Sequence, residues 1–302
     1  MNLAEIETFL MIVETKNITK TAENLFLSQP TVSHRLKSLE EELNVKLLTR
    51  KKGYKQIELT TQGEDFIPIA ERWMSVWQEM QMLKHGQQKL YLTIGCTDTL
   101  NSAMMFDLYR EMLDEKEQLM NLQIKTHYSS EIYQYLENHE IDLGFVHHHL
   151  WFKNIVAQPI LREKMYIIQS EPPALMQEVI HTDELDLNHE IFLSWESDYQ
   201  IWHDQWVTRG EKPRFQVDTF ELLFHLLSGE NMWAIAPITV VERIRKLRPV
   251  HVSMIGNEVQ PPERITYEIK HKYPKEATVR SVQLFEEKLK AYLSQKNWGY
   301  IK

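Results

Sequence analysis

Residues 19–40 read TKTAENLFLSQPTVSHRLKSLE, a stretch that predicts two short helices joined by a tight turn. Thr19 and Ser28 carry hydroxyls that can accept a free amide at a helix start. Pro30 falls in the first turn of the second helix, where its missing N–H costs nothing. Behind Ser28, apolar side chains recur at helical spacing and should form one buried face: Val32, Leu36, Leu39 and Leu43. The pattern is typical of a helix-turn-helix.

The opposite face of the second helix is polar, which favours readout of DNA. Donors of different lengths on this face could reach base edges or phosphates once the helix lies in a major groove. Ser33 and Arg35 are expected to face outward. The full set of residues predicted to contact DNA on this helix is Ser28, Gln29, Pro30, Thr31, Ser33, His34, Arg35 and Lys37.

A basic hairpin is predicted directly after this reading helix. Residues 46–50 and 57–60 alternate like two short strands, and residues 51–56 supply the turn. Residues 28–55 hold seven Lys and Arg against three Asp and Glu, although the whole chain carries a net charge of -9. We expect the basic side chains, Arg50 and Lys52 among them, to contact backbone phosphates without reading sequence. The alternative is a solvated basic loop.

A long helix should follow the hairpin. Thr60 or Thr61 can cap it, and residues 61–64 have the spacing of a capping box. Large apolar residues and one alanine then recur at steps of four, three, four and three, which is the spacing of a heptad seam. Such a seam needs either a partner helix or the core of its own domain. Its members are Phe66, Ala70, Trp73, Trp77 and Met80.

The bulk properties favour a globular protein. A chain of 302 residues with 43% hydrophobic residues suits two or three compact units. No run approaches the roughly 18–20 apolar residues of a membrane span, and the start lacks a basic and then apolar leader. The single cysteine, Cys96, excludes an intrachain disulfide and fits a reducing compartment. We expect a cytoplasmic protein that does not bind membranes.

Beyond residue 86 the sequence pattern changes and predicts alternating strands and helices, which is typical of an α/β domain. No repeat, low-complexity tract or Gly-rich phosphate loop interrupts it. We expect strands at 90–96, 122–128, 141–147, 190–195, 232–236 and 265–272, and helices near 100–118, 130–139, 200–209, 219–229, 238–247 and 277–295.

Candidate ligand-binding residues lie where these strands end, because ligands of open α/β sheets bind beyond the carboxyl ends of the strands. Hydroxyls and free helix amides there can hold an anion, although each hydroxyl could equally be a helix cap. Asp98 would repel an anion, which leaves open an amine-bearing or neutral ligand. The candidates are Thr97, Asp98, Thr99, Ser129, Ser130, His147, Ser197, Gln200 and Thr219.

Metal and enzyme chemistry are not expected. Adjacent side chains on an extended segment point to opposite faces, so the run His147–His149 and Cys96 do not have metal-ligand spacing. The chain contains no nucleophile-elbow, zinc-protease or nucleotide-binding glycine motif. We therefore predict no cofactor, no metal and no catalytic residues.

The opening segment is similar to that of the LysR-type transcriptional regulators. Two residues depart from the family pattern: Thr21 stands where alanine is usual, and Asn44 where a glycine usually follows the helix. Asparagine also tolerates the left-handed conformation of a helix end, so the geometry is preserved. The match runs from Ala22 through Glu40 and continues at Glu42, Leu43, Val45, Leu47, Arg50, Leu59, Thr60 and Gly63.

The resemblance implies an α/β protein of three parts. These are a winged helix-turn-helix at 1–61, a linker dimerisation helix at 62–86 and an effector-binding domain at 87–302. The last would resemble the periplasmic binding proteins, with subdomain I at 90–161 and 266–302 and subdomain II at 162–265. A cleft between the subdomains would hold a small molecule.

The function implied is sequence-specific regulation of transcription. A small-molecule effector, expected to be a metabolite, would modulate a dimer or tetramer bound to double-stranded promoter DNA. Two alternatives stay open. A non-specific DNA-binding protein would show affinity that does not vary with base sequence. A solute-binding protein without regulatory role would share the C-terminal fold but would need a secretion signal and would not carry residues 1–61.

Overall fold

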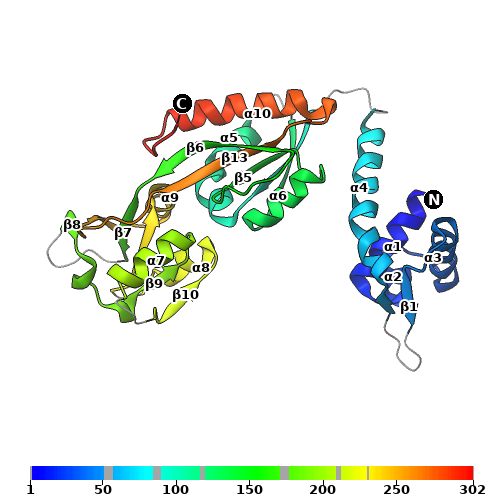
Figure 1. Ribbon diagram of the computed structural model, residues 1–302, viewed down its shortest axis with the longest axis horizontal. Helices are drawn as coiled ribbons and strands as arrows, with labels where there is room; N and C mark the ends of the chain where they lie inside the picture. The colour runs from blue at the N-terminus through cyan, green and yellow to red at the C-terminus, as the bar shows by residue number, and fades with distance from the viewer. Residues whose placement is uncertain are drawn as a thin grey trace. The chain divides into compact units, whose positions relative to one another are not determined.

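The computed structural model describes residues 2–50, 57–83, 90–115, 120–170, 177–208, 212–229 and 231–301. The chain divides into two units, residues 1–88 and 89–302 (Figure 1). The first unit contains α1 (Leu3–Thr15), α2 (Ile18–Asn24), α3 (Gln29–Leu43), the antiparallel strands β1 (Leu48–Arg50) and β2 (Ile57–Leu59), and α4 (Thr61–Leu83).

Side-chain caps fix where the helices of the first unit begin and end. The Asn17 side chain accepts the amides of Thr19 and Lys20, so α2 begins at Ile18 and the predicted cap at Thr19 is wrong. The predicted cap at Ser28 is confirmed, because its hydroxyl accepts the Thr31 amide at 3.3 Å. Asn44 ends α3 with a left-handed φ of 53°, as expected for a residue that replaces glycine.

Thr60, rather than Thr61, caps the long helix α4. Its hydroxyl oxygen accepts the Gly63 amide at 2.9 Å, and the same hydroxyl donates to the carbonyl of Lys46. Gly63 is required here because a Cβ at this position would lie 2.1 Å from the carbonyl oxygen of Leu47. The start of α4 is therefore held against the short segment between α3 and β1.

The predicted apolar face of α3 is confirmed, since Val32 and Leu39 are fully buried and Leu36 and Leu43 pack beside them. The predicted seam on α4 divides into two parts. Phe66 and Ala70 are buried in the core of their own unit, and the Phe66 ring lies 5.2 Å from that of Phe9 on α1. These two residues are therefore not available to a partner helix.

The remaining part of the seam is more open. The Trp73 and Trp77 rings stack at 5.8 Å, and Met80 is exposed. Ile69 and Val76 are also exposed apolar residues, and both lie outside the predicted seam. Ile69, Val76 and Met80 recur at steps of seven and four, so the exposed stripe is rotated from the predicted one, whereas the half-buried Trp73 packs against the core of its own unit.

The second unit begins with a five-stranded sheet in the order β4-β3-β5-β13-β6. The strands β3, β4 and β5 are parallel, and β13 runs antiparallel to β5 and β6. The strands are β3 (Leu90–Cys96), β4 (Met120–Thr126), β5 (Leu143–Val146), β6 (Ile155–Glu163) and β13 (Arg264–His271). The helices of this subdomain are the π-helix η1 (Leu100–Met105), α5 (Phe106–Asp114), α6 (Ser129–Glu137) and α10 (Glu276–Ser294).

A second sheet, in the order β11-β7-β12-β8, organises the other subdomain. Its strands are β7 (Met165–Gln169), β8 (Val179–Ile180), β11 (Trp233–Pro237) and β12 (His251–Ile255). A parallel pair, β9 (Ile191–Leu193) and β10 (Phe215–Val217), lies in the same subdomain. Its helices are the 3₁₀ turns η2 (Thr182–Glu184) and η3 (Leu187–His189), with α7 (Ser197–Trp206), α8 (Phe220–Leu226) and α9 (Ile238–Leu247).

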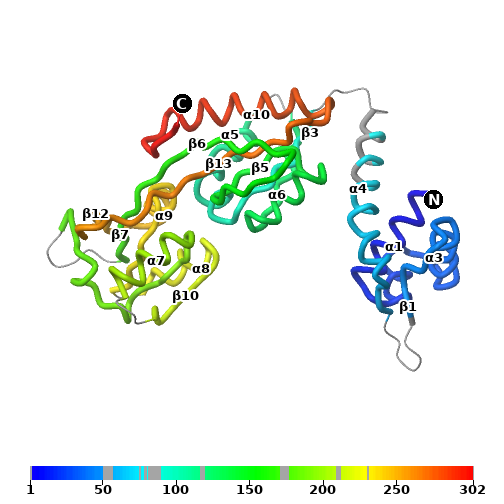
Figure 2. The backbone as a smooth tube through the Cα atoms, in the orientation of Figure 1, coloured from blue at the N-terminus to red at the C-terminus, as the bar shows by residue number. Residues whose placement is uncertain are grey.

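The chain crosses between the subdomains twice, from β6 into β7 and from β12 into β13. The strands β6 and β13 run side by side along this connection (Figure 2). Each subdomain has its own core, with Trp233 and Phe192 central in one and Phe145 and Phe285 in the other. The α/β architecture predicted from the sequence is confirmed, whereas β6, β7, β8, β10 and β12 were not predicted.

Candidate functional site

The exposed polar surface of α3 is the first candidate site. His34 and Lys37 are exposed and Ser33 is half-buried, in the middle of the helix. Lys37 pairs with Glu41 at 3.4 Å, but both side chains are more than half exposed, so the pair is easily exchanged for another partner.

The first turn of α3 is exposed as well. The hydroxyls of Ser28 and Thr31 lie 2.8 Å apart, and the Gln29 side-chain amide donates to the Thr19 hydroxyl at 2.8 Å. Pro30 is exposed in the same turn. These contacts join α2 to the start of α3, so the turn presents its polar groups in a fixed arrangement.

Arg35 does not face outward as expected. Its guanidinium Nη1 donates to the Thr8 hydroxyl on α1 at 3.3 Å, and the side chain is half-buried. One turn on, the Ser38 hydroxyl donates to Glu5 of α1. This edge of α3 therefore positions the helix against α1. Arg50 ends β1, and Lys52, predicted to contact phosphate, lies outside the described residues.

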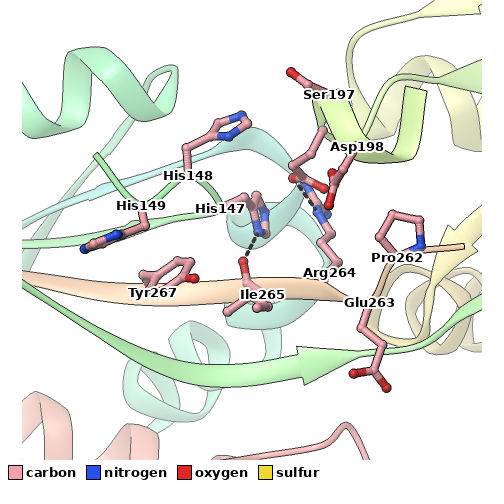
Figure 3. A pocket seen from close by; sticks show the side chains of 11 residues that line it. His147, His148, His149, Ser197, Asp198, Pro262, Glu263, Arg264, Ile265 and Tyr267 are labelled. Carbon is pink, nitrogen blue, oxygen red and sulfur yellow. Dashed lines mark hydrogen bonds and ion pairs between the residues drawn. The ribbon is translucent and has the colours of Figure 1, made fainter. Parts of the chain in front are cut away.

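The second candidate site is a cavity of about 320 Å³ where the two subdomains of the second unit meet (Figure 3). Of the predicted ligand residues, His147 and Ser197 line it. Sequence reasoning missed the contribution of the segment that leads into β13. The lining residues are His147, His148, His149, Glu196, Ser197, Asp198, Pro262, Glu263, Arg264, Ile265 and Tyr267.

Arg264 organises one wall of this cavity. The residue is 7% exposed, and its Nε donates to Glu196 at 3.0 Å. Its Nη2 donates to the Thr99 hydroxyl at 3.2 Å, and the guanidinium lies 4.6 Å over the Trp195 ring. A buried guanidinium is stable only when paired in this way. Arg264 thus ties the end of β3 to the start of α7.

His147 lies deeper in the same wall. It is 7% exposed, and its Nδ1 lies 3.4 Å from the carbonyl oxygen of Ile265. Burial lowers the pKa of His147 well below its ordinary value, and the charge of Arg264 lowers it further. The imidazole is therefore neutral near pH 7.

Asp98 and Thr99 connect the subdomains without lining the cavity. Asp98 Oδ2 accepts the backbone amide of Phe220, the first residue of α8, at 2.7 Å. Thr99 accepts from Arg264 as described above. A backbone amide of the other subdomain thus binds Asp98, and a direct contact between this carboxylate and a ligand stays a prediction.

The remaining predicted ligand residues do not line the cavity either. Thr219 caps α8 by accepting the Leu222 amide at 3.4 Å, and Gln200 donates to Asp204 within α7. Ser129 is buried in the first turn of α6, and the exposed Ser130 follows it. Thr97 carries a buried hydroxyl oxygen with no hydrogen-bond partner in the described structure.

Metal ligation and membrane crossing concern the same described residues. Among its residues, no group of three or more His, Cys, Asp and Glu could hold a metal ion. Within the same ranges, no helix is both long and apolar enough to cross a membrane.

Comparison with known proteins identifies the class. Residues 3–64 match the family model described as bacterial regulatory helix-turn-helix protein, lysR family, and residues 85–294 match the LysR substrate binding domain. Together these matches cover most of the chain, which therefore belongs to the LysR family of bacterial regulators.

Individual relatives match the chain at low sequence identity and over about half of its length. The chain is 31% identical over 144 residues to the HTH-type transcriptional regulator HdfR of Yersinia enterocolitica, a match that covers 47% of this chain and 48% of that protein. The HdfR of Yersinia pestis is 29% identical over 144 residues, with the same coverage. The chain thus spans about half the length of the curated relatives it matches.

Solved structures share the fold over nearly the whole chain. CbnR, a LysR family transcriptional regulator, is 18% identical with a TM-score of 0.71, covering 97% of this chain and 99% of that one. Full-length CbnR complexed with its target DNA gives a TM-score of 0.70 at 19% identity, covering 97% and 100%. A full-length point variant of OxyR from Pseudomonas aeruginosa gives 0.61 at 18% identity, covering 100% and 98%.

Proposed function

We propose that this chain is a sequence-specific DNA-binding regulator of transcription whose activity responds to a small molecule bound between its two α/β subdomains. The observation that carries the DNA-binding role is the face of α3. Its apolar side is buried, its first turn is fixed to α2, and His34 and Lys37 remain exposed. A helix presented in this way can enter a major groove.

Self-association belongs to the same proposal. The exposed stripe of α4 has heptad spacing and supplies a surface for the same helix of a second copy: Ile69, Val76 and Met80. A dimer of this kind would read two half-sites related by two-fold symmetry. We expect it to act in the cytoplasm, where bacterial promoter DNA lies, and to need no catalysis.

The reading role of α3 predicts different effects for its two exposed central side chains. His34→Ala should lower affinity for the preferred DNA site about tenfold to a hundredfold, because a base contact is lost, while affinity for scrambled DNA stays the same. The measurement is a binding titration against the DNA flanking the chain's own gene and against scrambled DNA of equal length. An unchanged ratio of the two affinities would remove His34 from the reading surface.

Lys37→Ala should act differently from His34→Ala. If Lys37 binds phosphate, its loss lowers affinity for both DNAs and reduces the slope of log affinity against log salt by about one. Glu41→Ala is the matched control, since it breaks the Lys37–Glu41 pair without removing the cation. A Lys37 variant with the salt slope of the parent would show that this side chain does not contact DNA.

A further inference from the structure

The cavity between the subdomains is lined by more carboxylates than cationic side chains. Three carboxylates line it, those of Glu196, Asp198 and Glu263, against the single guanidinium of Arg264. That guanidinium is already bound to Glu196 and Thr99 and stacked on Trp195. Glu196 is paired with this guanidinium and Glu263 with Arg162 at 3.5 Å, so Asp198 is the lining carboxylate that has no ion pair among the described residues.

His147 adds an acceptor to this lining. The Nδ1 of His147 lies 3.4 Å from the carbonyl oxygen of Ile265 and 3.5 Å from the Thr266 hydroxyl, and we assign the proton to Nδ1 because the carbonyl can only accept. In the neutral ring the other nitrogen, Nε2, then bears a lone pair. This Nε2 is buried and has no hydrogen-bond partner in the described part of the chain. A buried acceptor of this kind is costly unless a donor satisfies it.

The charge of the lining disfavours an anionic ligand. Asp198, at the start of α7, lines the cavity and has no ion-pair partner among the described residues. A ligand carboxylate in the cavity would face this like charge, whereas a cation would be attracted to it.

We propose that the cavity binds an organic ammonium compound, whose N–H groups donate to Asp198 beside the ring of His147. This inference rests on the proposed role of the cavity as the effector site. A volume of about 320 Å³ suits a compact molecule. The Tyr267 ring, which lies 5.5 Å from that of His149, supplies an aromatic face of the kind that attracts cations.

The test compares three probes of similar length on the full chain: 1,5-diaminopentane, glutarate and 1,5-pentanediol. Melting temperature is followed as each probe is titrated to about 10 mM, because a ligand that binds only the folded state raises it in a concentration-dependent way. The diamine is expected to raise the melting temperature, whereas glutarate and the diol leave it unchanged. Stabilisation by glutarate, equal stabilisation by the diol, or none by the diamine overturns the proposal.

Two variants on α7 test whether the diamine binds in the cavity. Asp198→Asn should weaken the binding of the diamine at least about tenfold, because it removes a charged acceptor. Its Oδ1 now accepts the Tyr199 amide, which an asparagine oxygen can also do, so the fold is kept. Asp204→Asn makes the same charge change on the same helix outside the cavity and should leave the affinity unchanged. Equal affinities in the two variants contradict the assignment.

The DNA titration separates this inference from the proposed function. Preference for own-gene DNA without diamine binding removes only the ammonium assignment. Diamine binding without any DNA preference removes the regulatory role and keeps the cation site.

Discussion

Replacing Arg264 with methionine is expected to destabilise the second unit by about 3–5 kcal/mol, the usual cost of removing one partner from a buried ion pair. Glu196, with its side chain 14% exposed, would lose its cation at 3.0 Å. The Thr99 hydroxyl and the Trp195 ring would lose the group that joins them. Urea unfolding, with hydrogen exchange to assign the transition to residues 89–302, measures the effect.

The loss of stability in the Arg264→Met variant should depend on pH. Glu163 is fully buried and lies opposite Arg264 in the register of β6 and β13. Burial raises the pKa of Glu163, and the charge of Arg264 opposes that rise. Without Arg264 the folded-state pKa of this carboxyl rises further above its unfolded value. A carboxyl whose folded-state pKa is raised destabilises the fold as the pH increases through that pKa, so the loss of stability in the variant should shrink on acidification.

Arg162→Met is the matched control for Arg264→Met. Arg162 forms a 3.5 Å pair with Glu263, but the two side chains are 54% and 39% exposed. Pairs of this kind contribute about 0–1 kcal/mol. A similar loss in both variants, or a deficit at Arg264 that is the same at acidic and neutral pH, would contradict the role given to Arg264.

Replacing Glu40 with alanine is expected to destabilise the first unit by about 2–4 kcal/mol, because two amides lose their acceptor and a buried carboxylate is removed from a network. Glu40 is 7% exposed, and its Oε1 accepts the amides of Leu47 and Leu48 at 3.0 and 3.2 Å. Lys46 donates to the other oxygen. This carboxylate therefore fixes the end of the reading helix to the first strand of the hairpin.

The measurement for Glu40 is urea unfolding combined with DNA binding. Under conditions that partly unfold the first unit of the Glu40 variant, its affinity for DNA should fall equally for all DNA sequences. Glu41→Ala, one residue on and 65% exposed at its side chain, should change stability by less than about 0.5 kcal/mol. Equal stability of the Glu40 and Glu41 variants would show that the carboxylate does not organise the hairpin.

Local sequence signals predicted the elements that depend on local chemistry. Ser28 and Asn44 mark the ends of α3 because capping is decided within a few residues. The start of α2 was missed because Asn17 and Thr19 are both good caps, and only the chain geometry selects between them. Among the strands, β6 carries Pro159 and a register shift opposite Thr266 and Tyr267, so its alternation is broken.

Long-range contacts were less predictable. Whether Arg35 faces DNA or α1 depends on where Thr8 lies, 27 residues earlier in the chain. Likewise, Phe66 belongs to a heptad pattern, yet its ring packs against Phe9. The cavity combines residues near 147, 197 and 264, and Arg264 lies at the start of a strand, whereas only the carboxyl ends of strands had been considered.

Sequence-specific regulation can be tested by titrating the full chain, at fixed salt, against the DNA flanking its own gene and against scrambled DNA of equal length. We predict a preference for the former of at least about a thousandfold, the lower range for a specific DNA-binding protein. Equal affinity for the two DNAs would contradict sequence-specific regulation.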